Sequence, residues 1–167
     1  MRRAIMIVSL MLTIAMLTPA GALAKAKGTS RPLTLNVSMT SIANLETSTN
    51  HYEGVVTGSH FGRGTVEGNG SFSGNEFGGF NYGDSFVITA ANGDKLFGES
   101  KGTITAGPEG FLVSSDVAVE QAITGGTGRF AYASGLVSGT YHQVVTSFIG
   151  PLLTFSDHGS PTGSISY

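Results

Sequence analysis

The stretch from Ile123 to Thr140 reads ITGGTGRFAYASGLVSGT, and it lies between two segments that alternate as strands do. Gly125, Gly126 and Gly128 permit a positive φ and a close approach of backbone, both of which a Cβ resists. Bulky side chains follow directly: Phe130, Tyr132 and Leu136. The stretch therefore predicts a fixed, aromatic-filled corner in a β-sheet. A phosphate-binding loop would need a helix after the glycines and a Gly-Lys-Ser/Thr ending, and neither is present.

Short alternating segments make up most of the chain on either side of this corner. Leu33 to Thr40 and Phe111 to Ile123 alternate apolar with polar residues, which is typical of half-buried strands. Asn92-Gly93 separates two further strand-like segments and predicts a hairpin with a type I′ turn. No segment shows a helical apolar period. About eight short strands with short connections predict an all-β fold, a small antiparallel β-barrel.

One segment is predicted as a loop rather than a strand, Gly74 to Gly83. It carries three aromatic residues: Phe77, Phe80 and Tyr82. We expect these side chains to fold back over one end of the barrel, and an exposed lid is the alternative.

The N-terminus has the pattern of a signal peptide. An arginine pair precedes an apolar run over residues 4–17, and Ala22-Leu23-Ala24 follows with the small-x-small pattern of a cleavage site. We expect cleavage after Ala24, or else after Ala26, and an uncleaved membrane anchor is the alternative. The predicted organisation is a signal peptide over residues 1–24, a flexible leader over 25–32 and a single β-barrel domain over 33–167. The predicted location is secreted or periplasmic.

Composition excludes several classes of function. Loss of Arg2 and Arg3 with the signal peptide would change the formal net charge from −2 to −4, and no basic stripe remains to neutralise the phosphates of a nucleic acid. No second apolar stretch has the length of a membrane span, so we expect a soluble mature protein with no membrane partner. The absence of cysteine excludes disulfides, thiolate zinc sites and cysteine nucleophiles. The oligomeric state is left open.

Strand parity decides which side chains enter the interior of a small barrel. The apolar parity of Phe111 to Ile123 sends Asp116 and Glu120 to the solvent face, and the segment over 95–105 likewise turns its charges outward. The polar groups then expected inside are Ser100, Ser115, Gln121, Ser138, Thr140 and His142. An apolar cavity with a few orienting polar groups is the usual lining of a small-molecule site. A barrel filled by its own side chains is the alternative.

His142 and Tyr141 are the catalytic candidates. An imidazole inside the barrel acts as a general acid or base near neutral pH, although a lone histidine on such a face also fits a purely structural role. Because Gly135, Val137 and Gly139 are also apolar, the opposite parity, with Tyr141 inside, stays open. No paired carboxylates on one inward face, nucleophile elbow or cofactor motif is recognised. Two candidate ligands, Glu46 and His51, are too few for a metal site.

Two segments together resemble a known family. Ala91 to Gly98 reads ANGDKLFG and is followed by Gly102-Thr103, and Ile123 to Gly135 reads ITGGTGRFAYASG. In order and spacing they are similar to secreted bacterial proteins of the allene-oxide-cyclase-like and dirigent-like barrel group. The resemblance covers about residues 84–145, and it implies a compact eight-stranded antiparallel barrel. Plant members guide the cyclisation or coupling of hydrophobic small molecules inside the barrel, and none of their functional residues is carried over to a position here.

Three hypotheses of function follow. The leading one is a barrel that binds a hydrophobic small molecule in its interior. The second, implied by the resemblance, is an isomerase or cyclase that acts by confinement, which needs no recognisable acid–base motif. The third is a structural or surface-interaction protein with a filled barrel. Whether the protein is an enzyme is left open, and no cofactor is expected.

Overall fold

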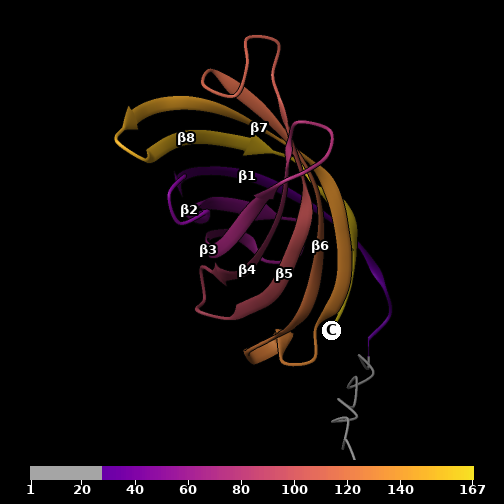
Figure 1. The fold of residues 1–167 in the computed structure, drawn as a ribbon. Coiled ribbons are helices and arrows are strands. Elements are labelled where there is room, and N and C mark those ends of the chain that lie inside the picture. The colour runs from indigo at the N-terminus through magenta and orange to yellow at the C-terminus, as the bar shows by residue number, and fades with distance from the viewer. Residues whose placement is uncertain (1–27) are drawn as a thin grey trace, which may run out of the picture.

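The computed structural model describes residues 28–167, and these residues form an antiparallel β-barrel (Figure 1). The strands are β1 (Arg31–Asn44), β2 (Thr49–Gly58), β3 (Gly62–Gly74), β4 (Phe80–Ala90), β5 (Lys95–Ala106), β6 (Ser114–Gly126), β7 (Ser134–Ile149), β8 (Leu152–Gly159) and β9 (Thr162–Ser166). A single 3₁₀ turn, η1 (Gly128–Phe130), is the one helical element in this part of the chain. The prediction of an all-β barrel is confirmed.

The barrel begins earlier in the chain than the predicted domain boundary. The predicted signal peptide and its cleavage site lie outside the described residues. The predicted leader over 25–32 is too long, because β1 already begins at Arg31 and Pro32 pairs with Ser164 of β9. The barrel strand therefore starts two residues before Leu33, where the apolar alternation begins.

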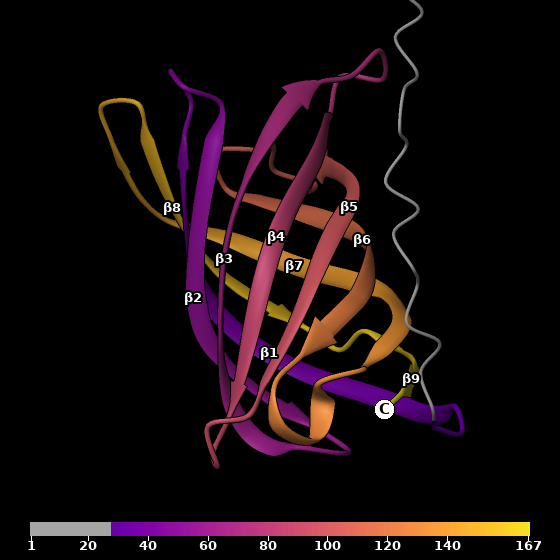
Figure 2. The ribbon, with the colours of Figure 1, turned by 90° about the horizontal axis from the view of Figure 1, so that it is seen from below.

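The sheet closes on itself because β1 pairs with both β2 and β8 (Figure 2). β8 and β9 occupy the same place between β7 and β1: β8 pairs with one half of each neighbour and β9 with the other half. Between them Pro161, which has no N–H to donate, accepts a hydrogen bond from Leu35 N at 3.0 Å. Because β8 and β9 share one place, the nine strands occupy eight positions around the barrel, in agreement with the predicted number.

Strictly antiparallel order places alternate connections at opposite ends of the barrel. We call the end that carries the connections over residues 45–48, 75–79, 107–113 and 150–151 the mouth. The other end, with the connections over 59–61, 91–94 and 127–133 and the start of β1, is the closed end. It is filled by fully buried apolar side chains: Leu33, Leu96, Phe130 and Ile165.

Glycines inside the strands make room for aromatic rings. Four interior rings lie over a glycine directly opposite on a neighbouring strand: Tyr52 over Gly68, Tyr82 over Gly102, Phe86 over Gly98 and Tyr141 over Gly159. A Cβ at any of these glycines would overlap the ring that covers it. This pairing accounts for four of the 25 glycines, since a narrow barrel admits a large ring only where its neighbour has no side chain.

The glycine corner seals the closed end, though its glycines act in different ways. Gly128 has a φ of +56°, and Gly126 has no positive φ but leaves no space for a Cβ between Lys95 and Phe130. Gly125 shows neither constraint. The corner delivers the Phe130 ring into the barrel, where it packs edge-on against Tyr167 at a centroid distance of 5.1 Å. The predicted aromatic-filled corner is present, while Tyr132 and Leu136 are exposed.

The Asn92-Gly93 hairpin lies against this corner. Lys95 N donates to Thr127 Oγ1 at 2.9 Å, Thr127 N donates to the Lys95 carbonyl at 2.8 Å, and Arg129 Nε lies 3.6 Å from an oxygen of Asp94. The predicted type I′ turn is wrong, because such a turn needs a positive φ at two central residues and only Gly93, with a φ of +87°, has one. The two segments that carry the family resemblance therefore contact each other at the closed end.

A candidate ligand-binding cavity in the barrel

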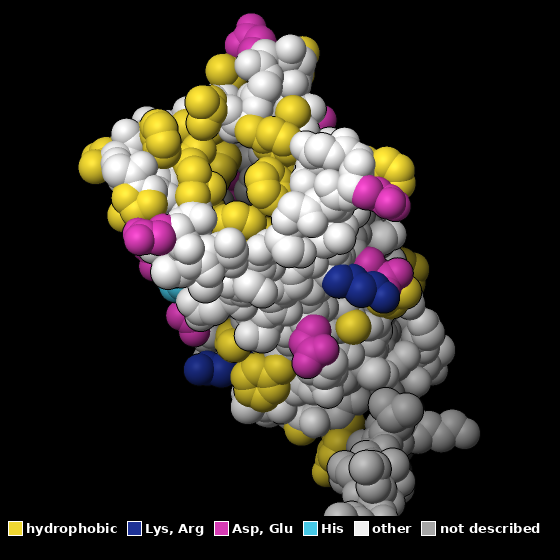
Figure 3. All heavy atoms as spheres, in the orientation of Figure 1, with side chains coloured by type: hydrophobic (Ala, Val, Ile, Leu, Met, Phe, Trp, Pro, Cys, Tyr) yellow, Lys and Arg dark blue, Asp and Glu magenta, His cyan; other side chains and the backbone are white. Residues whose placement is uncertain are grey.

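The mouth half of the barrel contains a cavity of about 310 Å³. Figure 3 shows hydrophobic side chains gathered around its opening. The apolar side chains near the mouth that line it include Phe72, Phe80, Phe111, Leu112, Leu153 and Phe155. The barrel is thus filled at its closed end and hollow toward its mouth, which contradicts the alternative of a wholly filled interior.

The aromatic residues predicted to cover a barrel end divide into two groups. Phe80 and Tyr82 belong to β4 and line the cavity. The predicted loop over 74–83 is therefore too long, because the connection between β3 and β4 spans only residues 75–79. The Phe80 ring packs edge-on against Phe72 and Phe111, at centroid distances of 5.6 Å and 5.3 Å. These contacts link β3, β4 and the β5–β6 connection at the mouth. Phe77 is 87% exposed at the tip of the β3–β4 connection and covers nothing.

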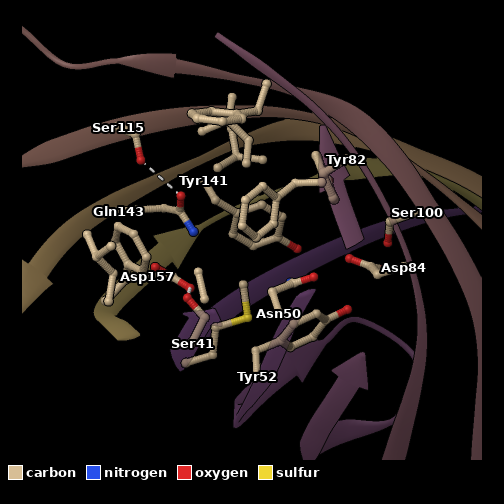
Figure 4. A pocket seen from close by; sticks show the side chains of 18 of the residues that line it. Ser41, Asn50, Tyr52, Tyr82, Asp84, Ser100, Ser115, Tyr141, Gln143 and Asp157 are labelled. Atoms are coloured by element: carbon tan, nitrogen blue, oxygen red, sulfur yellow. Dashed lines mark hydrogen bonds between the residues drawn. The ribbon is translucent and has the colours of Figure 1, made fainter. Parts of the chain in front are cut away.

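Polar side chains gather deeper in the cavity (Figure 4). The amide of Gln121 joins two of them: its Nε2 donates to Ser100 Oγ at 3.3 Å and its Oε1 accepts from the Tyr141 hydroxyl at 3.3 Å. Ser115 Oγ donates to Gln143 Oε1 at 2.9 Å. The inward orientation predicted for Ser100, Ser115 and Gln121 is confirmed.

Asp157, on β8, is a carboxyl with no exposed surface. Ser41 Oγ donates to its Oδ2 at 2.6 Å, while its Oδ1 has no hydrogen-bond partner. Burial raises the pKa of Asp157 to about 6, and the side chains of Ser41 and Gln143 and the charge of His158 offset only part of this effect. Burial therefore shifts the titration of Asp157 toward neutral pH.

Asp84, on β4, is a second cavity carboxyl. It pairs with Gly70 of β3, which in turn pairs with Asn50 of β2. Because Gly70 has no side chain, Asn50 and Asp84 approach each other: a Cβ at Gly70 would lie 2.5 Å from the Asp84 Cβ and 2.9 Å from Asn50 Oδ1. Oδ1 of each residue is buried without a hydrogen-bond partner. Burial raises the pKa of Asp84, and the nearby hydroxyls of Ser100 and Tyr52 lower it by less.

Three tyrosines complete the polar part of the cavity: Tyr52, Tyr82 and Tyr141. Burial, together with the negative charge of Asp84, raises the pKa of each above its ordinary value. At neutral pH all three are uncharged hydroxyls, which both donate and accept hydrogen bonds.

The prediction that His142, Ser138 and Thr140 face the interior is wrong. All three are exposed, and His142 Nδ1 lies 2.9 Å from Asp116 Oδ1 on the outer surface with 56% of the side chain exposed. The pairing of β7 with β6 explains this, because Tyr141 lies opposite Val117, and both face inward. The alternative parity, with Tyr141 inside, is the one observed.

The sequence does not predict the two cavity carboxyls, because strand parity places most of the charged side chains on the solvent face. The predicted loop over 74–83 ends just before Asp84, whereas Asp84 lies well inside β4, which begins at Phe80. Asp157 lies in β8, after a Gly150-Pro151 turn that hides the alternation of the following strand. The signal that identifies Asp84 is its spacing from Phe86 and Ile88, whose parity it shares.

The histidines do not build a site. His51 bonds to Asn69, His60 to the Pro32 carbonyl and His158 to Ser156, and none of the four histidines lines the cavity. Across residues 28–167, no group of three or more His, Cys, Asp or Glu side chains is arranged to hold a metal ion. Over the same residues no helix is long and apolar enough to cross a membrane.

Comparison with family models, curated proteins and solved structures finds no match to this chain. The resemblance to the allene-oxide-cyclase-like and dirigent-like group therefore stays a prediction.

Proposed function

We propose that the protein binds a hydrophobic small molecule inside its barrel. The observation that carries this proposal is a cavity of about 310 Å³ whose outer part is lined by aromatic and aliphatic side chains and whose inner part holds a few polar groups. Small-molecule sites have this composition, with volumes of roughly 300–1,000 Å³. The opening at the mouth gives a ligand a path to the cavity, because the apolar side chains surround a hollow at the surface (Figure 3). Secretion, which the N-terminal sequence predicts, is part of the same proposal.

A cavity-filling variant tests this function. Ala43 lines the cavity on β1, and Ala43→Phe is expected to occupy its outer part and weaken the binding of a neutral fluorescent probe, N-phenyl-1-naphthylamine, by about tenfold or more. Ala118→Phe makes the same change at an exposed position on β6 and serves as the control. Failure of the probe to bind the wild-type barrel, or equal binding by both variants, would contradict the proposal.

An isomerase or cyclase is the second candidate, favoured by one observation beyond the sequence resemblance. Asp157, with a pKa raised to about 6, faces an apolar cavity and suits proton transfer to or from a confined substrate at neutral pH. If a hydrophobic substrate that the protein isomerises or cyclises is identified, Asp157→Asn is expected to abolish its turnover while its binding persists. Turnover that survives this change would remove Asp157 from the proposed mechanism.

A further inference from the structure

We propose that the ligand of the cavity is an organic cation, an alkyl- or arylammonium whose apolar body fills the mouth half and whose charge is neutralised by Asp84 and Asp157. This inference rests on the proposed function, since it names the chemical class of the molecule bound at the same site. It requires that the cavity accept hydrogen bonds, carry negative charge without a protein counter-ion and open toward a face that attracts cations.

Unpartnered acceptors are the first observation. Three buried side-chain oxygens have no hydrogen-bond partner in the described part of the chain, and all three belong to residues that line the cavity: Asn50 Oδ1, Asp84 Oδ1 and Asp157 Oδ1. The Asp157 side chain is entirely buried and uses only its other oxygen, toward Ser41. Buried oxygens normally accept a hydrogen bond. A ligand must therefore carry a hydrogen-bond donor to provide these three oxygens with a partner. An ammonium group donates up to three hydrogen bonds.

Uncompensated charge is the second observation. Asp84 and Asp157 lie on β4 and β8, on different walls of the cavity (Figure 4), and the cavity lining contains no lysine, arginine or histidine. A buried carboxyl without a positive partner is pushed toward its neutral form, which agrees with the raised pKa of both groups. A bound ammonium would supply one positive charge, which offsets part of the negative charge and favours the ionised form of the carboxyl that it contacts.

The distribution of charge over the surface is the third observation. The mouth connections carry Glu46, Glu76 and Glu109, all exposed, and contain no lysine or arginine. Four of the five basic residues described lie at or near the closed end, Arg31, Arg63, Lys95 and Arg129, and the fifth, Lys101, pairs with Glu120 on the outer face. In Figure 3, acidic side chains lie near the opening as well as farther along the barrel, whereas the basic ones in this view lie away from the opening. The field at the mouth therefore favours the entry of cations and disfavours anions.

A set of probes with similar phenylalkyl bodies tests the inference by isothermal titration calorimetry on the purified protein at pH 7.5. We expect 4-phenylbutylammonium to bind about tenfold more tightly than 4-phenylbutan-1-ol, and 4-phenylbutyrate to bind most weakly. Asp84→Asn and Asp157→Asn are each expected to remove most of the preference for the ammonium while binding of the alcohol changes less than about twofold. Asp116→Asn makes the same change on the outer face, where the carboxyl contacts His142, and is expected to leave all three affinities unchanged.

The wild-type protein gives an independent reading should a variant fail to fold. Affinity for the ammonium is expected to fall as pH is lowered from 7.5 to 5, while affinity for the alcohol stays constant. The other titratable groups that face the cavity are the three tyrosines, which stay protonated over this pH range. His158 lies next to Asp157 on the outer face of β8, and His158→Gln is the control for its contribution. Equal or tighter binding of the alcohol would overturn the cation inference and leave the proposed function standing. If none of the probes binds, the proposed function fails as well.

Discussion

Asp157 shows how one residue couples the cavity to the stability of the barrel. Its carboxyl has no exposed surface, and its pKa rises from an ordinary 3.8 to about 6 because burial penalises the ionised form. The folded protein then holds this proton more tightly than the unfolded chain does. Between about pH 4 and pH 6 each increase in pH therefore lowers the free energy of unfolding. Above pH 6 the destabilisation by the buried charge is complete and no longer changes with pH. Asp84 acts in the same direction, since burial raises its pKa as well.

Asp157→Asn is expected to stabilise the unliganded protein at pH 7.5 by roughly 1–4 kcal/mol, the free-energy equivalent of removing such a shift. An asparagine oxygen still accepts the hydrogen bond that Ser41 donates, so the substitution removes charge with little change in packing. Urea unfolding of both proteins at pH 4, 5, 6 and 7.5 measures the effect. The difference between them should grow as pH rises, and a wild type that gains stability relative to the variant over this range would refute the assignment.

At the scale of elements, the β4–β5 hairpin and the glycine corner form one unit that closes the barrel. Thr127 joins them twice, through its side chain to Lys95 N and through its own N–H to the Lys95 carbonyl. This unit lies at the opposite end from the cavity. The most recognisable motifs of the sequence therefore serve closure of the barrel, and they do not supply any residue that lines the cavity.

Thr127→Ala tests this division of roles. The change leaves the Lys95 N–H without its acceptor and is expected to lower the free energy of unfolding by about 1 kcal/mol. Affinity for a cavity probe should stay unchanged, because the substitution lies at the closed end. Thr140→Ala, at an exposed position on β7, is the matched control. Loss of probe binding in a Thr127→Ala protein that is still folded would show that the corner also shapes the cavity.

Most of the strands can be predicted from alternation, but the inward face of β7 cannot. On β6 the bulky residues define the inward face, so Ser115 and Gln121 were placed correctly. On β7 the inward face carries Gly135 and Gly139, which lie against β9 and Pro161, while Leu136 and Val144 are exposed. The size of the side chains therefore predicts the wrong inward face for β7, and with it the wrong orientation for His142. Only the pairing with neighbouring strands determines the face of such a strand.

At the scale of the whole molecule, the barrel is polarised along its axis. Among residues 28–167, one end is packed and carries most of the basic residues, and the other is hollow and acidic. This arrangement depends on which connections share an end, a property of closure and strand order that composition does not reveal. A net charge of −2 for the whole chain conceals it. The consequence is kinetic, since charges around an opening act on a ligand before any contact is made.

Neutralising the mouth tests this consequence. The triple variant Glu46→Gln, Glu76→Gln, Glu109→Gln is expected to lower the association rate of 4-phenylbutylammonium several-fold at low ionic strength and to leave its dissociation rate nearly unchanged. Glu53→Gln, Glu67→Gln and Glu99→Gln together remove the same charge from exposed positions along the barrel wall and should have a smaller effect. Stopped-flow measurements at about 10 mM and 150 mM salt give the comparison, because the Debye length shortens from about 30 Å to about 8 Å between them. The difference between the mouth variant and the wild type should shrink at the higher salt concentration. Equal association rates for the mouth and wall variants at low salt would show that the acidic mouth does not steer the ligand.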